Sequence, residues 1–492
     1  MKIRPVLRVT GVICLVVSSA MLLPLCLALW DNSHDAWAFT VSFIVGGGMG
    51  LGLWFGLKRE ARISIGIREG LGITSLSWIA ASALGALPYS LGAGVSYTDA
   101  FFEAVSGFTT TGATIMTDIE ALPRGILLWR SLTHWMGGMG IIVLSLAVLP
   151  FLGVSGMEMY KAEVPGLTAE KVTPRLHQTA LRLWGVYVFL TLLETVFLMA
   201  GGMSLFEAFA HSCSTIATGG FSTRNSSIAG FGPYVQWVIV VFMALSGVNF
   251  SLYFLLMAKN LRDFFADEEL RAYLWVIALS VLAMSLSLWG ANLTLGLEHT
   301  IRRTAFHIVS VLTTTGFVAE DYNLWPEFTR FMFILLTFCG ACGGSTGGGC
   351  KVSRFIILWR KLRGEISGLL HPRAIITSRF NSRPITREVS DGAMSFFVLY
   401  FAILATGTLI TSAFGLDIVS AFTGVLTCLS NVGPGLHRLG PVENFAWLPG
   451  AVKWLFSLCM LAGRLELFAV FLLFWPETYR RSDSTILIGD DS

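Results

Sequence analysis

Four short glycine-bearing tracts recur along the chain, at residues 109–113, 216–220, 313–317 and 431–435. Glycine adopts left-handed backbone dihedrals without a Cβ penalty, so such a tract can turn successive carbonyl groups to one side. Rings of backbone carbonyls replace the hydration shell of a monovalent cation in ion-selective filters. The four tracts therefore predict a filter that binds a dehydrated cation.

The tracts recur at an interval that predicts an internal repeat. Their central glycines, Gly112, Gly219, Gly316 and Gly433, lie 107, 97 and 117 residues apart. A phenylalanine stands ten residues before the glycine in three tracts and eleven before it in the fourth. Any single tract is also compatible with an ordinary turn or a helix-packing glycine. Four tracts at matched spacing favour a repeated unit instead.

The predicted cation ligands surround each central glycine. Threonines before it offer hydroxyl groups at the inner end, and the fourth tract, Asn-Val-Gly-Pro-Gly, aligns with the TVGYG loop of potassium channels. Short helices that precede the tracts would direct their partially negative ends toward the membrane centre, which favours a cation. The predicted ligands are Thr110, Thr111, Gly112, Thr218, Gly219, Gly220, Thr315, Gly316, Phe317, Val432, Gly433 and Pro434.

A second glycine-rich segment, residues 340–350, interrupts an apolar stretch. Six of its eleven residues are glycine, and each costs a helix about 1 kcal/mol relative to alanine. Irregular backbone at membrane depth must line a cavity or be buried in protein. We therefore expect a flexible plug below the filter; a loop displaced past the membrane end is the alternative. The predicted gate residues are Gly343, Gly344, Ser345, Thr346, Gly347, Gly348 and Gly349.

A single arginine, Arg464, lies deep in the last apolar segment. An arginine there costs at least about 2.5–3.5 kcal/mol, so it must face a cavity or a partner. Either it is a fixed positive charge below the filter that binds loop carbonyls, or it pairs with an acid such as Glu466 or Glu194. Glu194 and His134 are candidates for proton coupling or for ordinary hydrogen bonding.

The composition of the 492-residue chain indicates the environment of these residues. Apolar residues make up 54% and charged residues 13%, against about 25% charged in soluble proteins. This excludes a soluble globule and a disordered chain, and a net charge of +3 gives no reason to expect a nucleic-acid partner. Ten segments are long enough to span a bilayer: 7–30, 36–57, 70–92, 125–151, 178–201, 233–258, 270–290, 328–358, 390–414 and 448–475.

Four shorter apolar segments lie between the later spans, at 98–110, 204–216, 300–314 and 417–430. Each precedes a glycine tract, so each is predicted to be a re-entrant half-helix. The expected fold is an all-α polytopic membrane protein. Two N-terminal helices precede four helix–half-helix–helix repeats arranged pseudo-fourfold around a central cation pore. The expected units are residues 1–69, 70–176, 177–266, 267–389 and 390–492.

Lysine and arginine fix the expected orientation. With the N-terminus inside, 25 of the 34 basic residues fall in inner segments and eight in outer ones, as the positive-inside rule requires. Both termini are then cytoplasmic. Acids near the first tract (Asp99, Glu103, Asp118 and Glu120) either concentrate cations or are ordinary loop charges.

Other chemistry finds little support in the sequence. Eight cysteines are too sparse for a disulfide framework, and no His-x-x-x-His or paired-acid motif indicates an enzyme. A receptor without transport does not account for four re-entrant tracts. The glycines at 46–50 lie inside an expected span rather than in a nucleotide-binding turn. We therefore expect no covalent cofactor, and any nucleotide response would come through a partner.

The motifs together resemble the Trk/Ktr/HKT superfamily of potassium transporters, and most closely its TrkH/TrkG family of membrane subunits. The resemblance covers nearly the whole chain. The motifs are SGFTTTGAT (106–114), HWMGGMGI (134–141), STIATGGFST (214–223), TTTGF (313–317), GACGGSTGGGCKVSR (340–354), NVGPG (431–435) and LAGRLELF (461–468).

The resemblance implies potassium uptake, with tightly coupled potassium–proton or potassium–sodium symport as the alternative. Gly112 implies potassium preference, residues 340–350 an intramembrane gate, and Arg464 a functional charge. It also implies a homodimer with one pore per protomer and a cytosolic nucleotide-binding ring, TrkA. The basic loop 351–387 is suited to docking such a partner or to binding anionic lipid.

Overall fold

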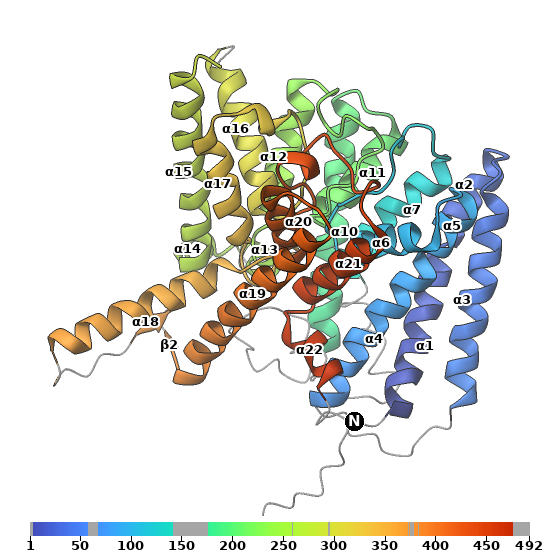
Figure 1. The fold of residues 1–492 in the computed structure, drawn as a ribbon, viewed down its shortest axis with the longest axis horizontal. Helices are drawn as coiled ribbons and strands as arrows, with labels where there is room; N and C mark the ends of the chain where they lie inside the picture. The colour runs from blue at the N-terminus through green and yellow to red at the C-terminus, as the bar shows by residue number, and fades with distance from the viewer. Residues whose placement is uncertain are drawn as a thin grey trace, which may run out of the picture.

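Helices form nearly all the regular structure of this computed structural model (Figure 1). It describes residues 3–57, 67–140, 176–257, 259–293, 296–371, 373, 378–381 and 383–475. Within these ranges, six helical segments are long and apolar enough to cross a membrane. They are Ile3–Trp30, Ala36–Gly56, Glu69–Gly92, Ala180–Ala200, Glu268–Gly290 and Val389–Ala413. Large apolar side chains exposed on them, such as Ile44 and Leu409, suit contact with lipid.

The spanning segments belong to eight helices. The first spanning segment comprises the helices α1 and α2, and the third comprises α4 and α5. In each pair, one residue separates the two helices. The others are α3, α10, α15 and α19. Their bounds are α1 Ile3–Ala20, α2 Leu22–Trp30, α3 Ala36–Gly56, α4 Ile67–Gly85, α5 Leu87–Gly92, α10 Leu176–Ala200, α15 Glu268–Gly290 and α19 Arg387–Ala413.

The four expected half-helices are present, and their ends agree with the sequence within three residues. They are α6 Tyr97–Phe108, α11 Leu205–Ile216, α16 Leu297–Leu312 and α20 Ile418–Ser430. Three begin with a side-chain cap: Ser96, Ser204 and Asp417 each accept a hydrogen bond from a backbone N–H three residues on. Such caps satisfy donors that the first turn leaves free.

The helix after each half-helix is short. These are α7 Arg124–Trp135, α12 Pro233–Ser246, α17 Glu327–Phe338 and α21 Gly450–Arg464. A π-helical turn, η1 Met136–Gly140, follows α7, and the rest of the predicted span 125–151 lies outside the described residues. The interruption predicted within 328–358 is confirmed, because α17 ends at Phe338 and α18 (Val352–Leu370) begins only at Val352.

Two predicted continuous helices are wrong. Segment 233–258 bends by 91° between α12 and the pair η3 Phe250–Leu252 and α13 Tyr253–Met257. Segment 448–475 breaks after Arg464, and α22 Phe468–Phe474 follows. Hydropathy does not detect these breaks because the few polar residues at them, such as Asn249 and Glu466, lie between apolar stretches. At the second break Glu466 and Leu467 adopt left-handed dihedrals, with φ of 61° and 59°.

The remaining elements lie mainly at the two ends of the molecule. The long helix α18 projects from the bundle beside a two-stranded hairpin, at the end where the chain begins (Figure 1). The turn between α15 and α16 lies at the opposite end (Figure 1). The smaller elements are α14 Leu261–Ala266, η4 Tyr322–Leu324, η5 His437–Leu439, β1 Arg379–Phe380 and β2 Arg383–Pro384. The unit boundaries inferred from the sequence stay predictions.

Candidate ion filter and gate

Each glycine tract contains two residues in the left-handed region of the backbone map. The first follows the half-helix and has φ between 52° and 61°: Thr110, Thr218, Thr314 and Asn431. The second stands two residues later and has φ between 78° and 96°: Gly112, Gly220, Gly316 and Gly433. Residues with a Cβ pay roughly 1–2 kcal/mol in this region. Because the same two conformations recur in every tract, they align the four tracts residue by residue; we call this alignment the backbone register.

This register corrects the alignment of the second tract. Gly220, rather than Gly219, takes the place of Gly112, and Gly219 corresponds to Thr111. The phenylalanine on the half-helix is therefore ten residues before the glycine in two tracts and eleven before it in the other two. The sequence could not distinguish the two adjacent glycines, since only the backbone conformation separates them.

The four tracts close into a ring through these glycines. Each glycine lies so near the next tract that an added Cβ would overlap a carbonyl oxygen there. The contacts run from the first tract to the second, on to the third and fourth, and back to the first. The pairs are Gly112 with Gly219, Gly220 with Thr315, Gly316 with Val432, and Gly433 with Thr111.

The carbonyl groups met by these glycines form what we call the carbonyl ring: those of Thr111, Gly219, Thr315 and Val432. All four residues are buried. No residue in the described part of the chain donates a hydrogen bond to any of these four oxygens. Buried backbone carbonyls almost always have a partner. The carbonyl ring is therefore suited to a cation that takes the place of a donor.

Several other predicted ligands are engaged elsewhere. The carbonyl oxygen of Phe317 accepts a hydrogen bond of 2.7 Å from Ser310 Oγ. The hydroxyl groups of Thr111 and Thr315 bond to those of Thr109 and Thr313, at 2.8 and 2.7 Å. By contrast, the hydroxyl of Thr110 is buried and has no hydrogen-bond partner among the residues that the structure describes. Carbonyl oxygens, more than hydroxyls, are thus available at the ring.

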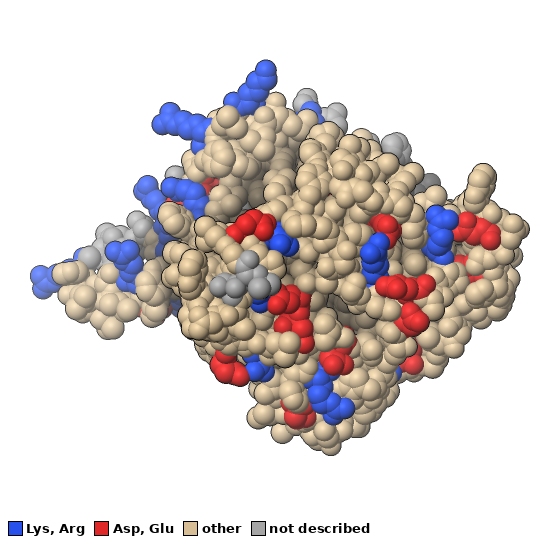
Figure 2. Space-filling view, turned by 90° about the horizontal axis from the view of Figure 1, so that it is seen from above, with Lys and Arg blue, Asp and Glu red and all other residues tan. Residues whose placement is uncertain are grey.

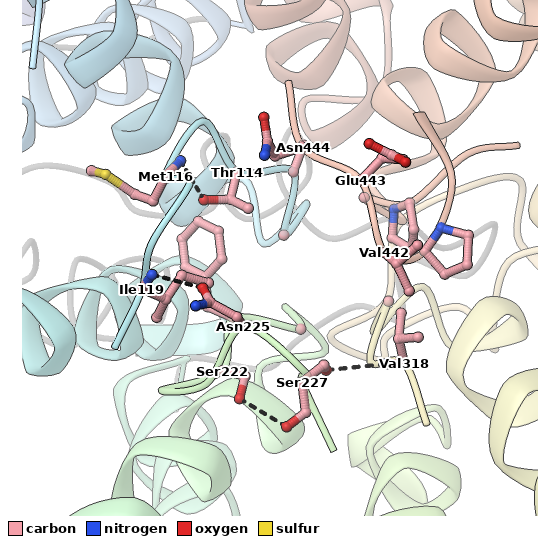
Figure 3. Close-up of a pocket in the computed structure, with 18 of the residues that line it drawn as sticks. Thr114, Met116, Ile119, Ser222, Asn225, Ser227, Val318, Val442, Glu443 and Asn444 are labelled. Atoms are coloured by element: carbon pink, nitrogen blue, oxygen red, sulfur yellow. Dashed lines mark hydrogen bonds between the residues drawn. The ribbon is translucent and has the colours of Figure 1, made fainter. Parts of the chain in front are cut away.

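A cavity of about 120 Å³ opens next to the ring (Figure 3). All four left-handed glycines line it. Further lining residues come from the connections after the tracts: Thr114, Ser222, Val318, Glu443 and Asn444 (Figure 3). This volume exceeds the ~10–15 Å³ of accessible space that one water needs. The cavity is therefore large enough to hold several water molecules beside the ring.

The acid that lines this cavity was missed by the sequence reading. It is Glu443, whereas the expected acids make protein contacts. Asp99 pairs with Lys453 at 2.5 Å, and Asp118 accepts a hydrogen bond of 3.2 Å from Asn225 Nδ2. Acidic and basic side chains lie next to one another over the end of the molecule seen in Figure 2. This pairing fits the ordinary-charge alternative for Asp99 and Asp118.

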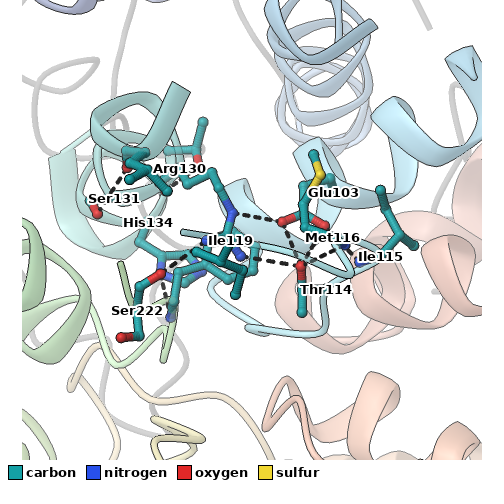
Figure 4. Close-up of polar contacts among 12 residues, drawn as sticks. Glu103, Thr114, Ile115, Met116, Ile119, Arg130, Ser131, His134 and Ser222 are labelled. Carbon is teal, nitrogen blue, oxygen red and sulfur yellow. Dashed lines mark hydrogen bonds and ion pairs between the residues drawn. The ribbon is translucent and has the colours of Figure 1, made fainter. Parts of the chain in front are cut away.

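A buried ion pair joins the first two tracts (Figure 4). Arg130 Nε donates to Glu103 Oε1 at 2.9 Å, and both side chains are at most 1% exposed. Glu103 also accepts hydrogen bonds of 2.9 Å from the Thr114 hydroxyl and the Ile115 N–H, just past the first tract. Arg130 donates to the carbonyl of Ser222 past the second tract, at 3.0 Å. The pair thus ties two neighbouring tracts together.

The position of Glu103 has counterparts in the next two repeats. Glu103, His211 and His307 each stand nine residues before the left-handed glycine of their tract. Nε2 of His211 lies 2.9 Å from Ser222 Oγ, and Nε2 of His307 accepts from the N–H of Glu320 at 3.2 Å. In three repeats, therefore, a polar side chain on the half-helix anchors the chain beyond the filter. The corrected register would have been needed to recognise this pattern.

His134, a candidate for proton coupling, packs behind the second tract. Its ring stacks on Phe221 with centroids 4.1 Å apart, and a Cβ on Gly219 would overlap the ring. The Phe221 N–H donates to Nδ1 at 3.4 Å. These contacts fit a structural role for His134. Glu194 is buried in α10.

The predicted gate loop, residues 340–350, lies against the inner ends of the half-helices. The hydroxyl of Thr346 donates to the carbonyl of Ile216, where α11 ends, at 3.0 Å. The Gly348 N–H donates to the hydroxyl of Thr314 in the third tract at 2.7 Å. A Cβ on Gly348 would meet the Ser430 carbonyl in the fourth repeat at 2.5 Å. The loop therefore contacts three of the four repeats.

Arg464 connects the gate loop to the first repeat. One terminal nitrogen donates to the carbonyl of Thr346 at 2.7 Å. The other donates to the carbonyls of Gly137 and Gly138 in η1, at 2.7 and 2.9 Å. Glu466, which the sequence offered as a partner for Arg464, pairs with Arg354 instead. Arg464 thus binds loop carbonyls, the first of the two arrangements left open.

The fold and this site define a polytopic helical membrane protein in which four glycine tracts meet in one ring. The sequence profile of the TrkH family, described as a cation transport protein, matches residues 37–480. The chain belongs to the TrkH family, as its motifs had indicated.

Individual relatives agree with this assignment. The chain is 38% identical over 485 residues to the Trk system potassium uptake protein TrkH of Salmonella typhimurium, covering 98% of this chain and 100% of the relative. It is 35% identical over 477 residues to TrkG of Escherichia coli K12, covering 96% and 98%. The crystal structure of the potassium transporter TrkH from Vibrio parahaemolyticus matches with a TM-score of 0.88 at 34% identity, covering 98% and 100%.

Proposed function

We propose that this protein carries potassium ions into the cell through the ring of four tracts. The observation that supports this most directly is the carbonyl ring: four backbone oxygens of buried residues, one from each tract, none of which accepts a hydrogen bond from the described part of the chain. A ring of carbonyls is the ligand set that replaces the hydration shell of a potassium ion. Relatives over nearly the full chain are named potassium uptake proteins.

Selectivity would depend on the four left-handed glycines. Any side chain at these positions would overlap a carbonyl of the neighbouring tract. Each overlap would push two tracts apart and change the size of the ring. Glycine at all four positions therefore favours a closely packed ring of fixed size, which supports preference for potassium over sodium.

The gate loop and Arg464 would close the pathway below the ring. The loop is bound to half-helix ends and to a filter threonine, while Arg464 adds a positive charge and holds Thr346 in place. A cation leaving the filter would meet both. Opening therefore requires the loop to leave these contacts.

The end carrying α18 and the β1–β2 hairpin would face the cytoplasm in a bacterial inner membrane. The segment 351–387, which is rich in lysine and arginine, would bind a cytosolic nucleotide-binding ring of the TrkA type. This partner would supply any nucleotide response and control the loop. The protein would act as a homodimer with one pore in each protomer.

Ion flux in liposomes tests the proposal. Purified protein should take up rubidium, a potassium analogue, much faster than sodium, and Gly112→Ser should reduce this preference. Gly232→Ser is the matched control, because a Cβ at Gly232 meets no atom within 4 Å. Equal rubidium and sodium uptake by the wild-type protein would refute potassium selectivity. A reversal potential that follows the potassium gradient alone, at any pH or sodium gradient, would exclude tight symport.

A further inference from the structure

We propose that Glu269 is a positioning residue for gating, which clamps both ends of the gate loop and couples them to the cytoplasmic end of the molecule. The inference rests on the proposed gating role of the loop. Glu269 lies in the first turn of α15, outside the filter and the loop, and is only 6% exposed. The sequence reading did not select it.

One oxygen of Glu269 holds both ends of the irregular segment. Glu269 Oε1 accepts a hydrogen bond of 2.8 Å from the Gly343 N–H, near the start of the loop. The same oxygen accepts one of 2.9 Å from the Ser353 N–H, in the first turn of α18. A single atom of α15 therefore fixes the chain before and after the residues that contact the filter.

This contact differs in kind from two other anchors of the loop. Thr346 and Gly348 use neutral donors and acceptors, whereas Glu269 offers a carboxylate. Hydrogen bonds to an ionised acceptor are roughly twice as strong as neutral ones, and a buried acceptor is costly to leave unpaired. The loop cannot move far from its present place without breaking the bond from Gly343.

The two residues before Glu269 reach the hairpin and α18. Asp267 Oδ2 accepts a hydrogen bond of 2.7 Å from Asn381 Nδ2, in the turn between β1 and β2. The backbone N–H of Glu268 donates to Asn381 Oδ1 at 2.8 Å, and its carboxylate pairs with Arg360 of α18 at 2.6 Å. Three consecutive acids thus hold the hairpin, α18 and the gate loop. A partner that moves the hairpin or α18 would act on the loop through this turn.

A purely structural role is the competing explanation. Ser353 lies in the first turn of α18, whose N-cap residue Lys351 makes no side-chain cap. Glu269 therefore also satisfies a donor that a helix start leaves free. That role involves only Ser353, whereas the clamp also requires Gly343. A deletion within the loop therefore distinguishes the two explanations.

The test measures rubidium flux in liposomes without any partner protein. Glu269→Leu should raise flux about tenfold, the change expected for losing hydrogen bonds to a charged acceptor. Glu269→Gln keeps an acceptor oxygen and should show a smaller rise. Glu327→Gln is the matched control, since Glu327 also lies in the first turn of a helix but is exposed and pairs with nearby Arg330.

A double variant decides between clamp and structural cap. Deleting residues 345–348 removes the part that the clamp restrains, so adding Glu269→Leu to the deletion should not change flux further. The clamp would be overturned if folded Glu269→Leu leaves rubidium flux unchanged. It would also be overturned if Glu269→Leu raises flux by the same factor in the deletion variant as in wild type. If Glu269→Leu does not fold, unchanged flux in Glu269→Gln would overturn it. Wild-type protein without selective rubidium flux would instead refute the proposed function itself.

Discussion

At the scale of single residues, function depends on atoms that the sequence does not display. The carbonyl ring is built from backbone oxygens of Thr111, Gly219, Thr315 and Val432, which are two threonines, a glycine and a valine. What the sequence displays is the glycine opposite each oxygen. A glycine is needed there for two reasons, a left-handed φ and the absence of space for a Cβ.

The corrected register of the second tract leads to a prediction that separates Gly219 from Gly220. At Gly219 the obstacle to a Cβ is the ring of His134, whereas at Gly220 it is the Thr315 carbonyl and a φ of 82°. In a His134→Ala background, Gly219→Ala should retain rubidium flux. Gly220→Ala should lower it at least about tenfold, because the left-handed residue alone costs roughly 1–2 kcal/mol. Equal loss in both double variants would contradict the register.

Arg464 carries a second prediction at this scale. Arg464→Ala removes three hydrogen bonds from a charged donor, each worth about 1.5–3 kcal/mol. Leak flux of rubidium without partner protein should therefore rise at least about tenfold. The leak flux of Arg464→Lys should lie between those of wild type and Arg464→Ala, since one ammonium group cannot reproduce the forked guanidinium that bridges two chain segments. Arg438→Ala, an arginine on the surface beside Trp447, should match wild type. Unchanged leak flux in folded Arg464→Ala would contradict a gating role for Arg464.

At the scale of elements, the half-helices and the interruption within 328–358 could be predicted, whereas the bend after α12 and the break after α21 could not. Residues such as Ser204 and Asp417 mark half-helix starts in the sequence, because a cap acts locally. No comparable local signal marks the bend after α12 or the break after α21; at the latter, two residues that carry side chains, Glu466 and Leu467, adopt left-handed dihedrals. The glycines of the gate loop were visible because they are dense, whereas Glu269 is one ordinary acid in a helix start.

The pair Glu103–Arg130 gives a prediction about how elements are held together. Arg130→Met leaves Glu103 buried without its counter-charge, which should lower stability by about 3–5 kcal/mol. Adding Glu103→Gln should restore part of that loss, because the amide oxygen can still accept from Ile115. Thermal unfolding in detergent measures both. Arg124→Met is the control: Arg124 pairs with Asp31 but is 51% exposed, so it should cost at most about 1 kcal/mol.

At the scale of the whole molecule, the ring assembles residues that are more than 300 positions apart, since Gly433 lies against Thr111. Composition predicted a membrane protein, and the spacing of the tracts predicted that four of them belong together. The order in which they meet follows from the short helices after the half-helices, since α7, α12 and α17 each contact the next half-helix and α21 contacts α6. In the proposed function, all four tracts form the filter, whereas the gate loop is a single segment after the third tract, so ion recognition would be separate from closure.

That separation leads to the last prediction. Deleting residues 345–348 should raise rubidium flux without partner protein, because it removes the contacts of Thr346 and Gly348 with the half-helix ends and the third tract. The ratio of rubidium to sodium flux should stay close to that of wild type, since the deleted residues contribute no oxygen to the carbonyl ring. Gly112→Ser should give the reverse result, a lower ratio without increased leak. If the deletion also abolished selectivity, the loop and the filter would not act separately. Thr314, which accepts the hydrogen bond from Gly348, would then be the first residue to test as the connection between them.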